Sequence, residues 1–121
     1  MTERVFVYGT LKPGQERWSV LVPFVLPTGA DDAAAVSGLL YDTGSGWPAA
    51  VFDTAAGADV PGTVLTLRPE SVAEALDTLD AVEGVTSGLF HRILVEVEGQ
   101  SCWAYHWPGP VAGFQRIRCW P

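Results

Sequence analysis

The chain has 121 residues, enough for a single domain with a substantial hydrophobic core, and 48% of them are hydrophobic, which excludes intrinsic disorder. Its formal net charge of −7, with only seven scattered lysines and arginines, excludes a basic nucleic-acid-binding surface and argues against anionic membranes. We therefore expect one domain, residues 1–121, that binds a small molecule rather than nucleic acid or membrane. The sequence leaves the oligomeric state open.

The first predicted strand starts so close to Met1 that no room remains for a secretory signal peptide, and we expect a cytoplasmic protein. No apolar run approaches the ~20 residues that span a bilayer. Two cysteines, Cys102 and Cys119, are too few for a disulfide scaffold, and we expect both to be reduced. His91 and His106 do not combine with them at zinc-ligand spacings, so we expect no metal and no cofactor.

In chain order, the first half contains mainly short apolar segments bounded by Gly, Pro or Asp. Such segments predict strands, here over residues 5–8, 36–42, 49–53 and 62–67. A short helix is expected over residues 17–22, ended by Pro23, and loops are expected over residues 27–35 and 44–47.

The second half opens with the one strongly predicted helix, residues 69–83, which begins at Pro69 and ends before Gly84. A strand over residues 89–98 and its hairpin partner over residues 101–107 follow. Strands outnumber helices and hairpins dominate, so the pattern predicts an α+β domain with a mostly antiparallel or mixed sheet that closes on itself.

The predicted helix carries an acid where its core-facing stripe should continue. Val72, Leu76 and Leu79 are spaced four and three residues apart, and four further residues lead to Glu83. Burial and the helix dipole both raise the pKa of such a carboxyl, which suits a general acid or base. The alternative is a frayed helix end with Glu83 in water. The other acids of this helix fall off the stripe and are expected in solvent: Glu74, Asp77 and Asp80.

The first strand runs directly into a glycine loop. Gly9 and Gly14 match the outer glycines of a phosphate-binding P-loop, but Gln15 and Glu16 stand where that motif requires Lys and Ser or Thr. We therefore reject nucleotide binding. Two interpretations remain: a turn whose free amides hold an oxygen atom, or a plain structural turn.

Several short motifs occur together in a particular order. Residues 7–11 are V-Y-G-T-L, and residues 79–84 are L-D-A-V-E-G, followed by L-F-H-R at residues 89–92. Between them lie G-L-L-Y, W-P-A and V-P-G-T-V. The series resembles the γ-glutamylcyclotransferase-like family, with its V-Y-G-[ST]-L loop and L-D-x-x-E-G segment, over residues 5 to about 107. Phe90 departs from the tyrosine that many relatives carry there.

This resemblance implies a small mixed β-barrel with flanking helices and a cavity at one end. It also implies that Tyr8, Gly9, Thr10 and Leu11 bind the substrate through their main chain, with Glu83 as catalytic acid/base. The implied reaction releases 5-oxoproline from a γ-glutamyl amine or γ-glutamyl amino acid by attack of the substrate's own α-amine on its γ-carbonyl. The loop amides would hold either the developing oxyanion or the α-carboxylate, and the sequence does not decide between them.

Three side chains are further candidates for substrate contact. Tyr8 ends the first strand and Tyr105 lies on the hairpin, although a tyrosine in either place is more often a core aromatic with one hydrogen bond. Arg92 could pair with a substrate carboxylate or form a structural salt bridge. Two other functions stay open: a non-catalytic ligand-binding or interaction module of the same fold, and removal of a γ-glutamyl group from a larger biosynthetic intermediate.

Overall fold

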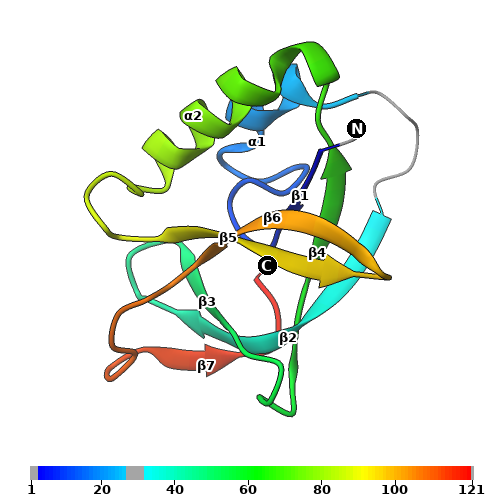
Figure 1. Ribbon diagram of the computed structural model, residues 1–121. Coiled ribbons are helices and arrows are strands. Elements are labelled where there is room, and N and C mark those ends of the chain that lie inside the picture. Colours follow the sequence, from blue (N-terminus) through cyan, green and yellow to red (C-terminus); the bar gives the residue numbers. More distant parts are fainter. Residues whose placement is uncertain (1–2, 27–31, 121) are drawn as a thin grey trace.

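The computed structural model describes residues 3–26 and 32–120. Their helices and strands follow in the order β1 (Arg4–Val7), α1 (Trp18–Leu21), η1 (Val22–Phe24), β2 (Asp32–Asp42), β3 (Pro48–Phe52), β4 (Asp59–Thr66), η2 (Pro69–Ser71), α2 (Val72–Val82), β5 (His91–Val97), β6 (Gln100–His106) and β7 (Gln115–Ile117). The strands wrap into one curved sheet, and α1 and α2 lie together over its upper end (Figure 1).

The sheet has the strand order β3-β2-β4-β1-β6-β5, with β7 paired to the far end of β2. Strands β1 and β6 are parallel, and the other pairs are antiparallel. The predicted α+β class with a mixed, barrel-like sheet is therefore confirmed.

One long strand and a hydrogen bond between the end of β6 and β3 bring the sheet close to closure. Strand β2 pairs with β4 through residues 32–37 and with β3 through residues 38–42. At Gly38, where the partner changes, a Cβ would lie 2.6 Å from a carbonyl oxygen of β3. On the other side, the Trp107 amide donates to the Ala50 carbonyl at 2.8 Å, which joins the end of β6 to β3.

The two faces of the sheet bury different sets of side chains, as the two-residue period of a strand requires. Val5 and Val7 of β1 pack in the cluster that includes Leu79 of α2. Phe6 and Tyr8, the residue that follows β1, pack in the second cluster, inside the barrel. Burying residues of this size stabilises the fold by about 1.5–3 kcal/mol per side chain. Both faces of β1 are therefore buried, one in each cluster, up to the point where the chain leaves the sheet.

The structure corrects several predicted boundaries. Of the loop predicted over residues 27–35, residues 27–31 lie outside the described residues. For residues 32–35 the prediction of a loop was wrong, because they form the start of β2. Alanine has a low strand propensity, but pairing with β4 supplies the hydrogen bonds that overrule it. The sequence also missed β7, whose only described strand partner is β2.

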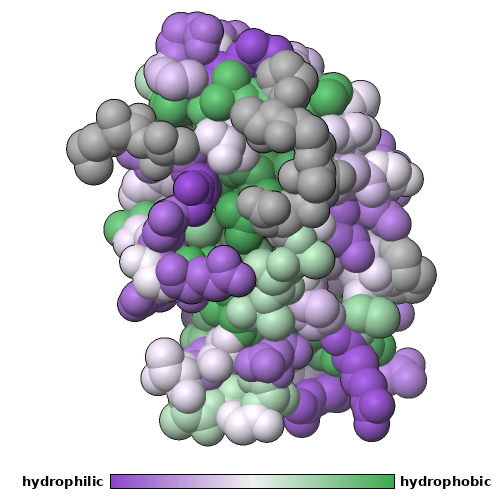
Figure 2. Space-filling model, turned by 90° about the vertical axis from the view of Figure 1, so that its right-hand side faces the viewer, coloured by the Kyte–Doolittle hydropathy of each residue, from purple (hydrophilic) through white to green (hydrophobic). Residues whose placement is uncertain are grey.

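The molecular surface is mixed in character. On the face shown in Figure 2, apolar residues form a band with hydrophilic residues above and to the sides. Cys102 is buried and Cys119 is exposed, and both are free thiols. None of the helices in the described part of the chain is long and apolar enough to cross a membrane.

Candidate active site

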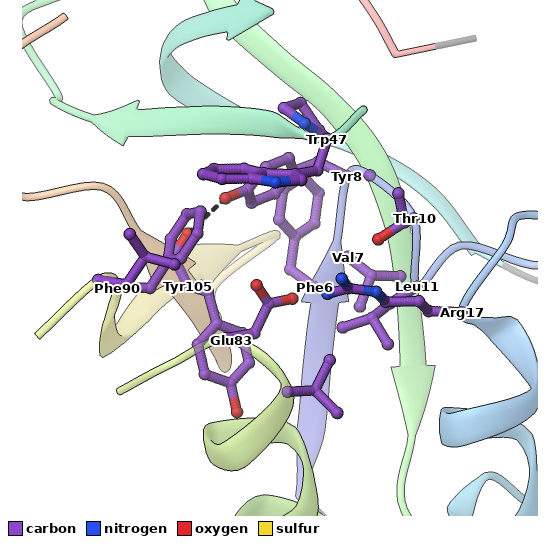
Figure 3. Close-up of a pocket in the computed structure, with 14 residues that line it drawn as sticks. Phe6, Val7, Tyr8, Thr10, Leu11, Arg17, Trp47, Glu83, Phe90 and Tyr105 are labelled. Carbon is purple, nitrogen blue, oxygen red and sulfur yellow. Dashed lines mark hydrogen bonds between the residues drawn. The ribbon is translucent and has the colours of Figure 1, made fainter. Parts of the chain in front are cut away.

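A cavity of about 100 Å³ opens at the end of β1, beneath the last turn of α2. Its walls come from parts of the chain far apart in sequence: residues 6–11, Arg17, residues 47–48, residues 82–83, residues 89–90 and Tyr105 (Figure 3). The predicted helix, glycine loop and hairpin thus meet at one place.

Six of the seven candidate site residues line this cavity: Tyr8, Gly9, Thr10, Leu11, Glu83 and Tyr105. Arg92 is not among the lining residues. Its Nε lies 3.4 Å from Asp80 Oδ1, and its guanidinium stacks 4.6 Å from the centre of the Trp103 ring. Of the two roles weighed for Arg92, the geometry matches the structural salt bridge.

The end of α2 fixes the position of Glu83. The Val85 amide donates to the Asp80 carbonyl at 2.9 Å and the Gly84 amide to the Ala81 carbonyl at 3.3 Å, the pair of bonds that defines a Schellman motif. Gly84 takes the left-handed conformation, with φ of 67°, that this motif requires. Glu83 is the C-cap residue, and its own amide still bonds to the Leu79 carbonyl at 2.9 Å. The predicted stripe therefore continues through Glu83 and directs its carboxyl into the cavity.

The surroundings of Glu83 favour its neutral form. Burial raises the pKa of this carboxyl from 4.5 to about 7, although the positive charge of Arg17 acts in the opposite direction. Figure 3 shows the carboxyl of Glu83 and the guanidinium of Arg17 turned toward each other across the cavity. They do not form an ion pair; the one salt bridge among the described residues joins Arg92 and Asp80. A carboxyl with a pKa near 7 can both take up and release a proton at neutral pH.

Two carbonyl groups hold the glycine loop in place. The Gly9 carbonyl accepts a bond from the Lys12 amide at 3.1 Å, and the Thr10 carbonyl accepts one from the Arg17 amide at 2.7 Å. Within residues 3–26 and 32–120, no acceptor is bonded to the amides of Gly9, Thr10 and Leu11. These amides are available to bind an oxygen atom.

Both tyrosine hydroxyls are engaged in hydrogen bonds. Tyr8 donates to the main-chain carbonyl of Tyr105 at 2.7 Å, and Tyr105 donates to Asp80 Oδ1 at 2.8 Å. Burial, reinforced by the charge of Glu83, raises the pKa of Tyr8 well above 10. Burial and the bond to Asp80 likewise raise the pKa of Tyr105. Each tyrosine therefore stays protonated and contributes its ring to the cavity wall. The expectation that Asp80 is simply solvated was wrong, because β6 brings Tyr105 against it.

Sequence reasoning missed two residues that shape the cavity, Arg17 and Trp47. Trp47 lies in the W-P-A segment, and its ring centroid is 5.7 Å from that of Phe90, which in turn lies 5.4 Å from Trp107. Trp47 and Phe90 line the cavity, so position 90 contributes an apolar edge without a hydroxyl. Membership of the W-P-A motif was a signal for Trp47, but no pattern in the sequence marked Arg17.

Comparison with known proteins agrees with the family resemblance of the sequence motifs. A family model described as γ-glutamyl cyclotransferase, AIG2-like, matches residues 5–119. No curated protein matches the sequence.

Solved structures share the fold. An AIG2-like protein from Mus musculus superposes with a TM-score of 0.77 at 22% identity, covering 99% of this chain and 88% of that one. Protein YtfP from Escherichia coli gives a TM-score of 0.62 at 30% identity, over 96% and 92% of the two chains. A γ-glutamyl cyclotransferase gives 0.58 at 19% identity, over 96% and 70%. Since the family model spans nearly the whole sequence, the chain belongs to the AIG2-like γ-glutamyl cyclotransferase family.

Proposed function

We propose that this protein is a cyclotransferase that releases 5-oxoproline from a γ-glutamyl amine or γ-glutamyl amino acid, with Glu83 as acid/base. The observation that carries this proposal is a partly buried carboxyl with a pKa of about 7, in a cavity that also contains the Gly9, Thr10 and Leu11 amides. Neither the carboxyl nor these amides have a partner among the described residues. Family membership supports the reaction class.

The chemistry needs no protein nucleophile. Glu83 takes a proton from the substrate's α-ammonium, and the freed amine attacks the γ-carbonyl carbon to form a five-membered ring. The bond between that carbon and the leaving amine then breaks as Glu83 returns its proton to the departing nitrogen. The ring nitrogen gives up its second proton to solvent, where it can protonate the released amine. Glu83 is thus regenerated in each cycle, and the products are 5-oxoproline and a free amine.

Positioning supplies much of the acceleration in such a reaction. A well-oriented intramolecular attack reaches effective molarities of about 10⁵–10⁸ M, provided that the reacting atoms are held close together. The small cavity restricts the glutamyl group, and the amides of Gly9, Thr10 and Leu11 offer fixed donors to a substrate oxygen.

The proposal is tested by incubating the protein with a panel of γ-glutamyl amines and γ-glutamyl amino acids in water labelled with heavy oxygen. We expect 5-oxoproline and amine in equal amounts, with no label in the 5-oxoproline. Labelled glutamate as the product would indicate simple hydrolysis and contradict the cyclisation.

A matched substrate sharpens this test. Acetylating the α-amine of a reactive panel member leaves the scissile bond intact but removes the attacking group, so we expect no turnover. Ligand binding without release from any panel member would favour a non-catalytic binding module of the same fold.

A further inference from the structure

Arg17 is placed to recognise the substrate but belongs to no motif that marked the site. Among the described residues that line the cavity, it alone carries a permanent positive charge. In a protein with a net charge of −7, a cation facing a cavity is a specific arrangement rather than part of a general basic surface.

The main chain holds Arg17 rigidly beside the glycine loop. Its amide donates to the Thr10 carbonyl at 2.7 Å, and its carbonyl accepts from the Val20 amide at 3.0 Å. Its side chain is partly buried and forms no hydrogen bond or ion pair with any residue in the described part of the chain. A guanidinium at the cavity wall, with no hydrogen-bond or ion-pair partner among the described residues, is suited to bind a carboxylate through two parallel bonds.

The opposite side of the same space carries Glu83, whose carboxyl faces the guanidinium without contacting it (Figure 3). We propose that Arg17 binds the α-carboxylate of the γ-glutamyl group while Glu83 receives the α-ammonium. An α-amino acid carries these opposite charges on one carbon, so its head group fits between a cation and an acid that face each other.

This assignment rests on the proposed function and deepens it in one respect. If Arg17 takes the α-carboxylate, the free amides of Gly9, Thr10 and Leu11 remain for the γ-carbonyl oxygen. They then stabilise the negative charge that develops there during ring closure, where fixed donors have the largest effect on rate.

Arg17 also links substrate binding to the basicity of Glu83. The groups that face Glu83 are Arg17, Tyr8 and Tyr105, and both tyrosines stay neutral, so Arg17 is the charge that lowers the pKa of the acid. A carboxylate bound at Arg17 offsets that charge. Glu83 therefore becomes a better proton acceptor when a substrate with an α-carboxylate is bound.

The first test compares the binding of 5-oxoproline and of its neutral amide, 5-oxoprolinamide, by calorimetry. We expect the wild type to favour the carboxylate by about 10- to 100-fold, the range for a hydrogen bond to a charged group. Arg17→Gln should abolish this preference, and Arg17→Lys should retain part of it. Arg118→Gln, which removes an exposed arginine outside the cavity, should leave it unchanged.

The second test uses kinetics with γ-glutamyl-p-nitroanilide and its α-amide. Arg17→Gln should slow the carboxylate substrate selectively, and it should move the acidic limb of the pH–rate profile for kcat/KM to higher pH. A merely structural role for Arg17 would slow both substrates equally and leave that limb in place.

The outcomes separate this inference from the proposed function. A wild type that releases 5-oxoproline, with a carboxylate preference that survives in Arg17→Gln, overturns the role of Arg17 alone. A wild type that shows no preference between the two ligands also overturns it. A wild type that neither binds these ligands nor turns over any γ-glutamyl compound overturns both.

Discussion

Asp80 and Glu83 stand one turn apart at the end of the same helix, yet their surroundings are opposite. Asp80 accepts a bond from the Tyr105 hydroxyl at 2.8 Å and pairs with Arg92 at 3.4 Å. Glu83 has neither partner, and burial raises its pKa to about 7. The difference arises from tertiary packing, because the two acids are only three residues apart at the end of α2.

The end of one helix thus carries both a carboxylate with a structural role and a carboxyl suited to acid–base catalysis. A carboxylate that is paired with a cation and a hydroxyl joins the elements that carry them, here α2, β5 and β6. A carboxyl that is desolvated and unpaired gains and loses its proton near neutral pH, as acid–base catalysis requires. Substitutions at the two positions should therefore affect different properties, turnover at Glu83 and stability at Asp80.

The largest expected effect is on turnover. Glu83→Gln keeps the size and polarity of the side chain but cannot accept a proton, so 5-oxoproline release should fall by roughly 10²–10⁴-fold. Initial rates measured by mass spectrometry check this, with Glu74→Gln, exposed on the same helix, as the matched control. A folded Glu83→Gln protein with wild-type rates would remove Glu83 from the mechanism.

The next effect is on the pH dependence of the wild type. Because the base must be ionised, kcat/KM should rise with pH and level off above the Glu83 pKa of about 7. Two pH units below that value the rate should be about 100-fold lower. A pH–rate profile from about pH 5 to pH 9 measures this, and an acidic limb near 4.5, the ordinary value for glutamate, would contradict it.

The stability of the fold should depend on the ionisation of Glu83 in the direction opposite to the rate, falling where the rate rises. The folded state holds the Glu83 proton more tightly than the unfolded chain, so the wild type should lose stability as pH rises from 4.5 to about 7. Glu83→Gln lacks this loss, and its free energy of unfolding relative to the wild type should increase across that range by at most about 3 kcal/mol. Urea unfolding at several pH values tests this, and a pH-independent difference would argue against a raised pKa.

The smallest effect belongs to Asp80. Asp80→Asn still accepts the Tyr105 hydroxyl but loses the charge opposite Arg92, so the free energy of unfolding should fall by about 1 kcal/mol or less. A double-mutant cycle with Arg92→Gln measures the pair itself. A loss of turnover as large as that of Glu83→Gln would erase the distinction between the two acids.

The sequence predicted Glu83 and not Arg17 for a physical reason. Helical periodicity is local, so the spacing of Val72, Leu76 and Leu79 already points Glu83 toward the core. The direction of Arg17 depends on turns that join it to Thr10, and no short-range pattern encodes that contact.

The fold shows the same division between local and long-range information. Hairpins and the Gly84 helix end follow from local signals, and they were predicted. The Asp80–Tyr105 contact and the pairing of β7 with β2 connect distant segments, and they were not. Motif order added what periodicity lacked, since it identified the family before any contact was known.

The close approach of Gly9 to Pro48 divides the cavity into a side that cannot change and a side that can. A Cβ at Gly9 would lie 2.6 Å from Pro48 Cγ, so any larger residue there must displace the start of β3. Leu89, in contrast, is 40% exposed at the rim of the cavity. Attempts to redirect this scaffold toward a different amine should therefore begin at position 89 and leave the glycine loop untouched.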